Sequence, residues 1–158
     1  ISITKIQKKN KHFHSRHNAK ERIYEYKIMN RIGSLSLNKN KAWHIKKKLS
    51  IKILKKGSKI LEGTHDFSTF RASSCSSYSP IKKMNVVHVK KKGDEITIEF
   101  KSKSFLQNQV RSMVGSLIYL SCGKWTINNF KKVFNSKKRS KCAPPAPAHG
   151  LYLKDVKY

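Results

Sequence analysis

Alternation of apolar and polar residues along the chain predicts five β-strands. Residues 2–7 and 22–28 each alternate in this way, which is typical of strands that bury one face. Residues 82–105 contain two more alternating runs, separated by a turn at 92–94, and this arrangement predicts a hairpin. Residues 151–158 alternate again at the end of the chain. Each strand is expected to turn one side toward a core and the other toward solvent or a ligand.

Apolar residues at helical spacing predict three helices. The first begins at Ser50, whose hydroxyl can cap it, and ends near Gly63. The longest apolar stripe begins near Phe105 and closes at Gly123, and a shorter helix follows the capping residue Thr126. The strands and helices together predict an α+β fold, in which an antiparallel β-sheet has helices packed on one face.

Two segments follow neither period. Residues 64–80 are small, polar and aromatic, which predicts a long connection, and long connections within compact domains often carry function. Residues 141–150 are rich in proline, which excludes both a helix interior and a central strand. Because the chain has no internal repeat and no stretch that separates two cores, residues 1–158 are interpreted as one domain.

Composition narrows the class of partner. The 158 residues include 36 Lys or Arg and 8 Asp or Glu, so the formal net charge is +28. A positive field of this size attracts polyanions and predicts salt-dependent binding of nucleic acid. The alternative is a compositional bias toward Lys, which supplies all but six of the basic residues and would add charge to any protein. The hydrophobic share of 37% excludes a disordered basic tail.

The number of cysteines and the length of the apolar runs indicate where in the cell the protein is expected. An odd number of cysteines without a C-x-x-C pair argues against a disulfide framework and predicts a reducing, cytoplasmic location. No apolar run approaches the roughly 20 residues of a membrane span, so no membrane association is expected. The chain begins with Ile1 rather than Met, which predicts that it belongs to a longer gene product.

A cation on an apolar helix is the strongest candidate for chemistry. Arg111 follows Val110 in the longest stripe, where a guanidinium is costly unless an anion or a hydrogen-bond partner meets it. A carboxylate or phosphate partner is one interpretation, and a side chain that extends to the surface is the other. Tyr24 and Tyr26 also have two possible interpretations. Aromatic residues on a strand are usually core, but in a basic protein they can stack on an unpaired base.

The sequence predicts no metal site, no glycine-rich phosphate-binding loop and no acidic nucleophile. His12, His14 and His17 are close in sequence, but their spacing fits neither face of a helix and no Cys or carboxylate ligand is near, so we expect no metal there. No glycine-rich phosphate loop is present. Most of the eight acids alternate with Lys or lie in turns, which is typical of solvated charge, and none is an obvious nucleophile.

Four sequence blocks resemble the TruA family of tRNA pseudouridine synthases. The blocks occur in the order of that family and extend over nearly the whole chain: FHSRHNAKERIYEYKIMN (13–30), HDFSTFRASSC (65–75), SFLQNQVRSMVGSLIYLSCGK (104–124) and APAHGLYLKDVKY (146–158). The resemblance implies an antiparallel sheet flanked by helices, with two half-domains around a basic cleft. It also implies a homodimer that holds the anticodon arm of tRNA.

The resemblance implies a reaction as well. A uridine is flipped out of the stem, its glycosidic bond breaks, the uracil rotates, and a carbon–carbon bond forms at C5 of the base. Members of the family use an aspartate and no metal or organic cofactor. Base extrusion needs a pocket that replaces the lost stacking, and the aspartate needs a nearby cation to stay ionised in a partly dry site.

Residue roles follow from the matching blocks. Tyr24 matches the active-site tyrosine, which stacks on the target base and is a candidate for handling the C5 proton. Arg111 matches the arginine that pairs with the catalytic aspartate, and Leu151 matches an apolar residue that packs near the uracil. Three more arginines are expected to contact RNA, with a solvated surface as the alternative: Arg16, Arg22 and Arg71.

The chain departs from the family at one decisive point. The family's aspartate lies in a G-R-T-D-A-G motif ahead of the first block, and no such string occurs here. We therefore expect the C-terminal portion of a longer tRNA pseudouridine synthase, inactive alone. The alternatives are a non-catalytic RNA-binding module of the same fold and an architectural, ribosome-associated protein. A smaller departure is Gln107-Asn108, where many members of the family carry two histidines.

Overall fold

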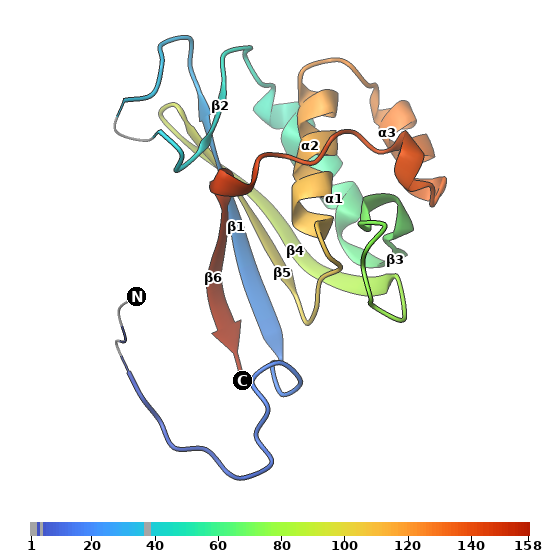
Figure 1. Cartoon of the computed structure of the whole chain (residues 1–158). Helices are drawn as coiled ribbons and strands as arrows, with labels where there is room; N and C mark the ends of the chain where they lie inside the picture. The colour runs from blue at the N-terminus through green and yellow to red at the C-terminus, as the bar shows by residue number, and fades with distance from the viewer. Residues whose placement is uncertain (1–2, 4, 37–38) are drawn as a thin grey trace.

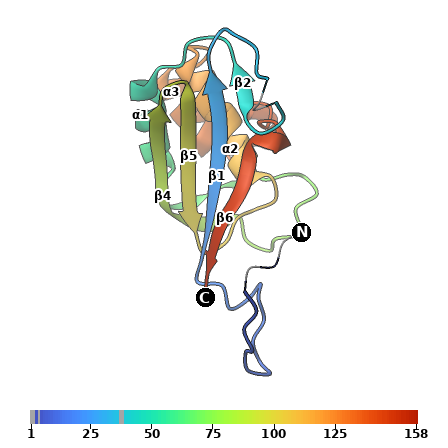
Figure 2. The ribbon, with the colours of Figure 1, turned by 90° about the vertical axis from the view of Figure 1, so that its left-hand side faces the viewer.

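One mixed β-sheet with helices on one of its faces makes up the part of the chain that the computed structural model describes, residues 3, 5–36 and 39–158 (Figure 1). Figure 2 shows the strands in front and the three α-helices behind them. The strands are β1 (Glu21–Asn30), β2 (Trp43–Ile45), β3 (Gly63–Asp66), β4 (Ile81–Lys92), β5 (Glu95–Ser102) and β6 (Leu151–Lys157). The helices are α1 (Ile51–Leu61), α2 (Gln109–Ser121) and α3 (Ile127–Asn135), with short 3₁₀ turns at Ser68–Phe70, Arg139–Lys141 and Ala148–Gly150.

Strand β1 lies at the centre of the sheet because it pairs along both edges. One edge pairs antiparallel with β5, and β4 and β3 extend the sheet beyond it, also antiparallel. The other edge pairs antiparallel with β6 and then parallel with β2. The prediction of an antiparallel sheet covered by helices on one face is confirmed. The parallel β2 makes the sheet mixed, since the long connection at 31–42 allows the return that a parallel pair needs.

Local sequence explains the helix starts and the hairpin. The side chain of Ser50 accepts the N–H of Ile53, and that of Thr126 accepts the N–H of Asn129, so both predicted N-caps are confirmed. The predicted hairpin is confirmed too, with Gly93 at φ 57° between β4 and β5. Apolar faces of the strands and helices meet in one core, which includes Tyr26, Ile28, Leu54, Ile98, Phe100, Met113 and Leu117.

Three expectations differ from the structure. Of the strand predicted at 2–7, residues 2 and 4 lie outside the described residues, and residues 3 and 5–7 are not in a strand because they pair with none of the described strands. The connection predicted at 64–80 contains most of β3, which pairs with β4. The helix predicted from Phe105 begins at Gln109, because Asn108 has φ 60°, a left-handed conformation that an α-helix excludes.

Candidate active site

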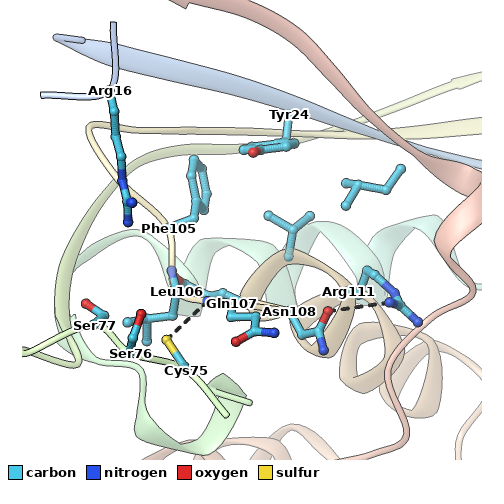
Figure 3. A pocket seen from close by; sticks show the side chains of 13 residues that line it. Arg16, Tyr24, Cys75, Ser76, Ser77, Phe105, Leu106, Gln107, Asn108 and Arg111 are labelled. Carbon is cyan, nitrogen blue, oxygen red and sulfur yellow. Dashed lines mark hydrogen bonds between the residues drawn. The ribbon is translucent and has the colours of Figure 1, made fainter. Parts of the chain in front are cut away.

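A cavity of about 360 Å³ lies between β1 and the start of α2. Its wall includes Tyr24 from β1, Arg111 from α2 and Leu151 from the start of β6, so the structure brings together three residues that are far apart in the sequence. Figure 3 shows Tyr24 across the cavity from the turn that precedes α2, with Arg16 and Arg111 at opposite ends of the view. The volume falls within the roughly 300–1,000 Å³ that is typical of small-molecule sites.

Arg111 is held in place by the proline-rich segment. Its Nε donates to the carbonyl of Ala146 at 2.7 Å, and its Nη1 donates to Oδ1 of Asn108 at 3.4 Å. None of the ion pairs among the described residues includes Arg111, so the hydrogen-bond partners on its side chain there are neutral oxygens. The half-buried guanidinium is therefore oriented but keeps an uncompensated charge, which suits an anion that enters the cavity.

Tyr24 is half-buried and packs edge-on against Phe105, with 5.0 Å between ring centroids and 86° between ring planes. Phe105 lies outside the helix, in the irregular segment just before the turn that contains the left-handed Asn108, and it lines the cavity beside Tyr24. Sequence reasoning assigned Phe105 to the helix and missed it as a site residue. The available signal for Phe105 as a site residue was an aromatic side chain at the start of the apolar stripe that contains Arg111.

Tyr26 belongs to the core and anchors the wall. It is fully buried, and its hydroxyl donates to the carbonyl of Pro147 at 2.7 Å. Burial raises the pKa of Tyr26, and the nearby charge of Arg111 lowers it to a smaller extent. Gly150 permits this contact, because a Cβ there would lie 2.8 Å from the Tyr26 ring. The segment before β6 is thus fixed to both α2 and β1, which places Leu151 at the cavity.

Two of the arginines predicted to contact RNA are occupied with backbone carbonyls. Arg22 donates from Nη1 to the carbonyl of Lys103 and from Nη2 to that of Arg16. Arg71 donates from Nη2 to the carbonyls of Cys75 and Ser77, each at 2.7 Å. Arg16 itself is exposed and lines the cavity, which Arg22 and Arg71 do not. RNA contact stays a prediction for all three.

Cys75 is a further residue of the cavity wall that sequence reasoning did not select. Burial tends to raise the pKa of its thiol, but hydrogen bonds from the backbone N–H groups of Gln107 and Ser77 and the charge of Arg71 outweigh burial and hold the pKa below its usual range. The bond from the N–H of Gln107 ties the 75–77 loop to the turn before α2, and the side chain of Arg71 binds the carbonyls of the loop.

The histidine-bearing loop shapes the site without forming a metal cluster. Among the described residues, no three His, Cys, Asp or Glu side chains come together as metal ligands could. The rings of His14 and His17 lie 4.3 Å apart between centroids, and Nδ1 of His14 accepts the N–H of Arg16 at 3.1 Å.

None of the described helices is long and apolar enough to cross a membrane.

Comparison with known proteins gives consistent matches. A family model described as tRNA pseudouridine synthase matches residues 58–158, a range that includes Arg111 and Leu151 but not Tyr24. The protein named tRNA pseudouridine synthase A from Pelagibacter ubique is 59% identical over 158 residues, which is 100% of this chain and 64% of the relative. Proteins of the same name from Caulobacter vibrioides and Paramagnetospirillum magneticum are each 40% identical over the whole chain, which spans 64% and 62% of their lengths.

Proposed function

The chain belongs to the tRNA pseudouridine synthase family, and we propose that it forms the part of such an enzyme that holds the target uridine of a tRNA. The convergence of Tyr24, Arg111 and Leu151 on one cavity is the observation that carries the proposal. The chain spans just under two thirds of the length of the curated relatives it matches. The activity of the whole protein is therefore part of the proposal.

The roles follow the geometry of the cavity. A flipped uracil stacks on Tyr24, and Leu151 packs on it from the start of β6. The N1–C1′ glycosidic bond of the uridine breaks, the uracil turns, and a C5–C1′ bond forms. The proton at C5 leaves and N1 gains one, so the product is an isomer of the substrate. Tyr24 is the candidate for handling the C5 proton, because its hydroxyl is on the residue that stacks.

The nucleophile of the proposed reaction is an aspartate from outside this chain. No G-R-T-D-A-G string occurs in the sequence, and Arg111 has only neutral partners among the described residues. An aspartate that enters the cavity would meet a guanidinium already oriented by Ala146. The chain alone is accordingly proposed to be inactive.

The remaining parts of the proposal rest on the resemblance. The substrate is a uridine of the anticodon stem-loop, and the active protein is a homodimer. A cytoplasmic location is included, with which the free thiols of Cys75, Cys122 and Cys142 agree. The exposed Arg16 contacts the RNA next to the flipped base.

The test uses the complete gene product and, separately, the chain of residues 1–158. Transfer RNA carrying tritium at C5 of uridine releases the label when pseudouridine forms. We expect release with the complete product and none with the chain alone. Release by the chain alone would contradict the external aspartate. A complete product that binds tRNA without releasing tritium would favour the non-catalytic RNA-binding module instead.

A further inference from the structure

A second cavity of about 430 Å³ adjoins the first. The two cavities share part of their walls, formed by Arg16, Tyr24, Ser76, Ser77 and Phe105. The aromatic pair of Tyr24 and Phe105 therefore lies between two neighbouring spaces. A base stacked on Tyr24 in the first cavity would have its own backbone within reach of the second.

The lining of the second cavity is cationic and hydroxylic. Four cationic side chains line it, from Arg16, Arg22, Lys82 and Lys103. Three serine residues do so as well: Ser76, Ser77 and Ser104. No Asp or Glu is among the lining residues. This set fits a phosphate with its ribose, because ammonium and guanidinium groups bind phosphate oxygens and hydroxyls bind both phosphate and sugar.

The cationic side chains of this cavity differ in how many of their N–H groups already donate to other protein atoms. The terminal nitrogens of Arg22 donate to the carbonyls of Lys103 and Arg16, so Arg22 positions two other members of the wall. Nζ of Lys82 donates to Oγ of Ser77 at 3.3 Å, which leaves two of its hydrogens for a ligand. Lys103 is exposed, and its Nζ takes part in none of the ion pairs among the described residues.

The lining of the second cavity differs from the outer face of the sheet in its balance of charges. On the outer face of the sheet, lysines are balanced by acids: Lys154 pairs with Glu25 and Glu99, and Lys101 pairs with Glu99. The lining instead carries one sign of charge.

We propose that the second cavity binds the phosphate and ribose of the nucleotide next to the flipped uridine, with Lys82, Lys103 and Arg16 on the phosphate. The proposal rests on the proposed function, because it takes the first cavity as the site of the flipped base. It assigns Arg22 a positioning role rather than a direct RNA contact. Removal of one lysine should reduce the magnitude of the negative slope of log affinity against log salt concentration by about 0.7.

The experiment pairs a protein change with an RNA change. In the complete gene product, Lys103→Gln and Lys82→Gln are each compared with wild type. The ligands are the anticodon stem-loop and two copies of it, each with one uncharged methylphosphonate linkage, on the 5′ or the 3′ side of the modified uridine. In wild type, one of these linkages should weaken binding by roughly tenfold, the scale of one charge-assisted contact. In Lys103→Gln or Lys82→Gln, where one contact to the phosphate is already lost, the same linkage should cause only a small further loss of affinity.

Lys131→Gln is the matched control, because it removes the same charge from the exposed side of α3. It should keep the full tenfold cost of the neutral linkage. Suppose that wild type forms pseudouridine but that each uncharged linkage weakens binding to the cavity variants as much as it weakens binding to wild type. The proposed phosphate site is then wrong, while the proposed function stands. If wild type forms no pseudouridine, the proposed function fails and the phosphate site fails with it.

Discussion

Arg111 and Ala146 are joined by two hydrogen bonds of opposite direction. The Nε of Arg111 donates to the carbonyl of Ala146 at 2.7 Å, and the N–H of Ala146 donates to the carbonyl of Arg111 at 2.9 Å. One bond uses the side chain and the other only backbone atoms. The backbone bond keeps α2 and the segment before β6 together whatever side chain is present. The side-chain bond fixes the direction of the guanidinium.

This arrangement predicts that replacement of Arg111 separates activity from stability. Arg111→Leu keeps the backbone bond and loses two side-chain hydrogen bonds, of which the one to Asn108 is long and exposed, so its unfolding free energy should fall by only about 1–2 kcal/mol. Pseudouridine formation by the complete gene product should fall by roughly hundredfold or more, as when an oriented electrostatic partner is removed. Thermal unfolding and tritium release measure the two effects.

Arg111→Lys is the informative companion variant. Lysine keeps the charge but has no Nε–H to donate to Ala146, so the cation loses its fixed direction. We expect activity close to that of Arg111→Leu. Wild-type activity in the lysine variant would show that charge alone is enough, and loss of the cooperative thermal transition in Arg111→Leu would show a structural role instead.

Tyr24 is predicted to act on the reaction more than on binding. Tyr24→Ala removes the ring that meets Phe105 at 5.0 Å, so it should suppress pseudouridine formation far more than it weakens tRNA binding. Tyr24→Phe keeps the ring and removes the hydroxyl. If that hydroxyl handles the C5 proton, the rate should fall by about 10²–10⁴-fold at unchanged affinity.

The control for Tyr24 is Tyr119→Ala, which breaks a similar edge-on pair with Trp125 at 5.3 Å outside the cavity. It should leave the rate unchanged. Single-turnover rates and filter-binding affinities separate the two effects. Equal losses of rate and affinity in Tyr24→Ala would count against stacking on the reacting base.

Local features of the fold were predictable, and features that depend on distant segments were not. Ser50 and Thr126 cap their helices through their own side chains, so the signal lies within four residues. Strand β3 is short, and its pairing with β4 rather than its own sequence defines it. The start of α2 is the exception, because it depends on the left-handed Asn108, a local feature that an apolar stripe does not reveal.

The same distinction holds in the candidate site. A costly cation at position 111 could be recognised from its apolar neighbours, but its partner could not. The sequence suggested a carboxylate or phosphate, and the structure provides the Ala146 carbonyl, 35 residues away. Likewise, the arginines at 22 and 71 could be identified as special against a lysine background, while their carbonyl partners depend on how loops meet in space.

Acid should weaken the outer face of the sheet through Glu99. Burial tends to raise the pKa of Glu99, but hydrogen bonds and charge from Lys154 and Lys101 outweigh it and hold the pKa below its ordinary value. A carboxyl with a lower pKa in the folded state stabilises the protein above its unfolded pKa of about 4.3. That stabilisation disappears as the pH falls through the folded-state pKa.

Lys154→Gln tests this linkage by thermal unfolding between pH 7 and pH 3. The variant should unfold at a lower temperature than wild type at pH 7, and the difference should shrink as the pH falls through the folded-state pKa of Glu99, which lies below its ordinary value. Lys131→Gln removes one charge without breaking any of the ion pairs among the described residues and serves as the control. A difference that is constant across the pH range would exclude the ion pair as its source.

Gly115 should be as important for activity as for stability, because it lets the segment before β6 approach α2. A Cβ at this position would lie 2.0 Å from the carbonyl oxygen of Pro144, a backbone atom that cannot rotate away. In Gly115→Ala the segment must therefore move, and the bonds between Arg111 and Ala146 must lengthen or break. We expect the unfolding free energy to fall by roughly 1–3 kcal/mol, the usual cost of overpacking.

Urea unfolding and tritium release from labelled tRNA check this prediction in the complete gene product. Gly33→Ala is the control, since a Cβ there meets nothing within 4 Å. The activity of Gly115→Ala should stay low even at a temperature where the variant is fully folded, because Arg111 has lost its orientation. A folded Gly115→Ala variant with wild-type activity would show that the cavity does not depend on the contact between Arg111 and Ala146.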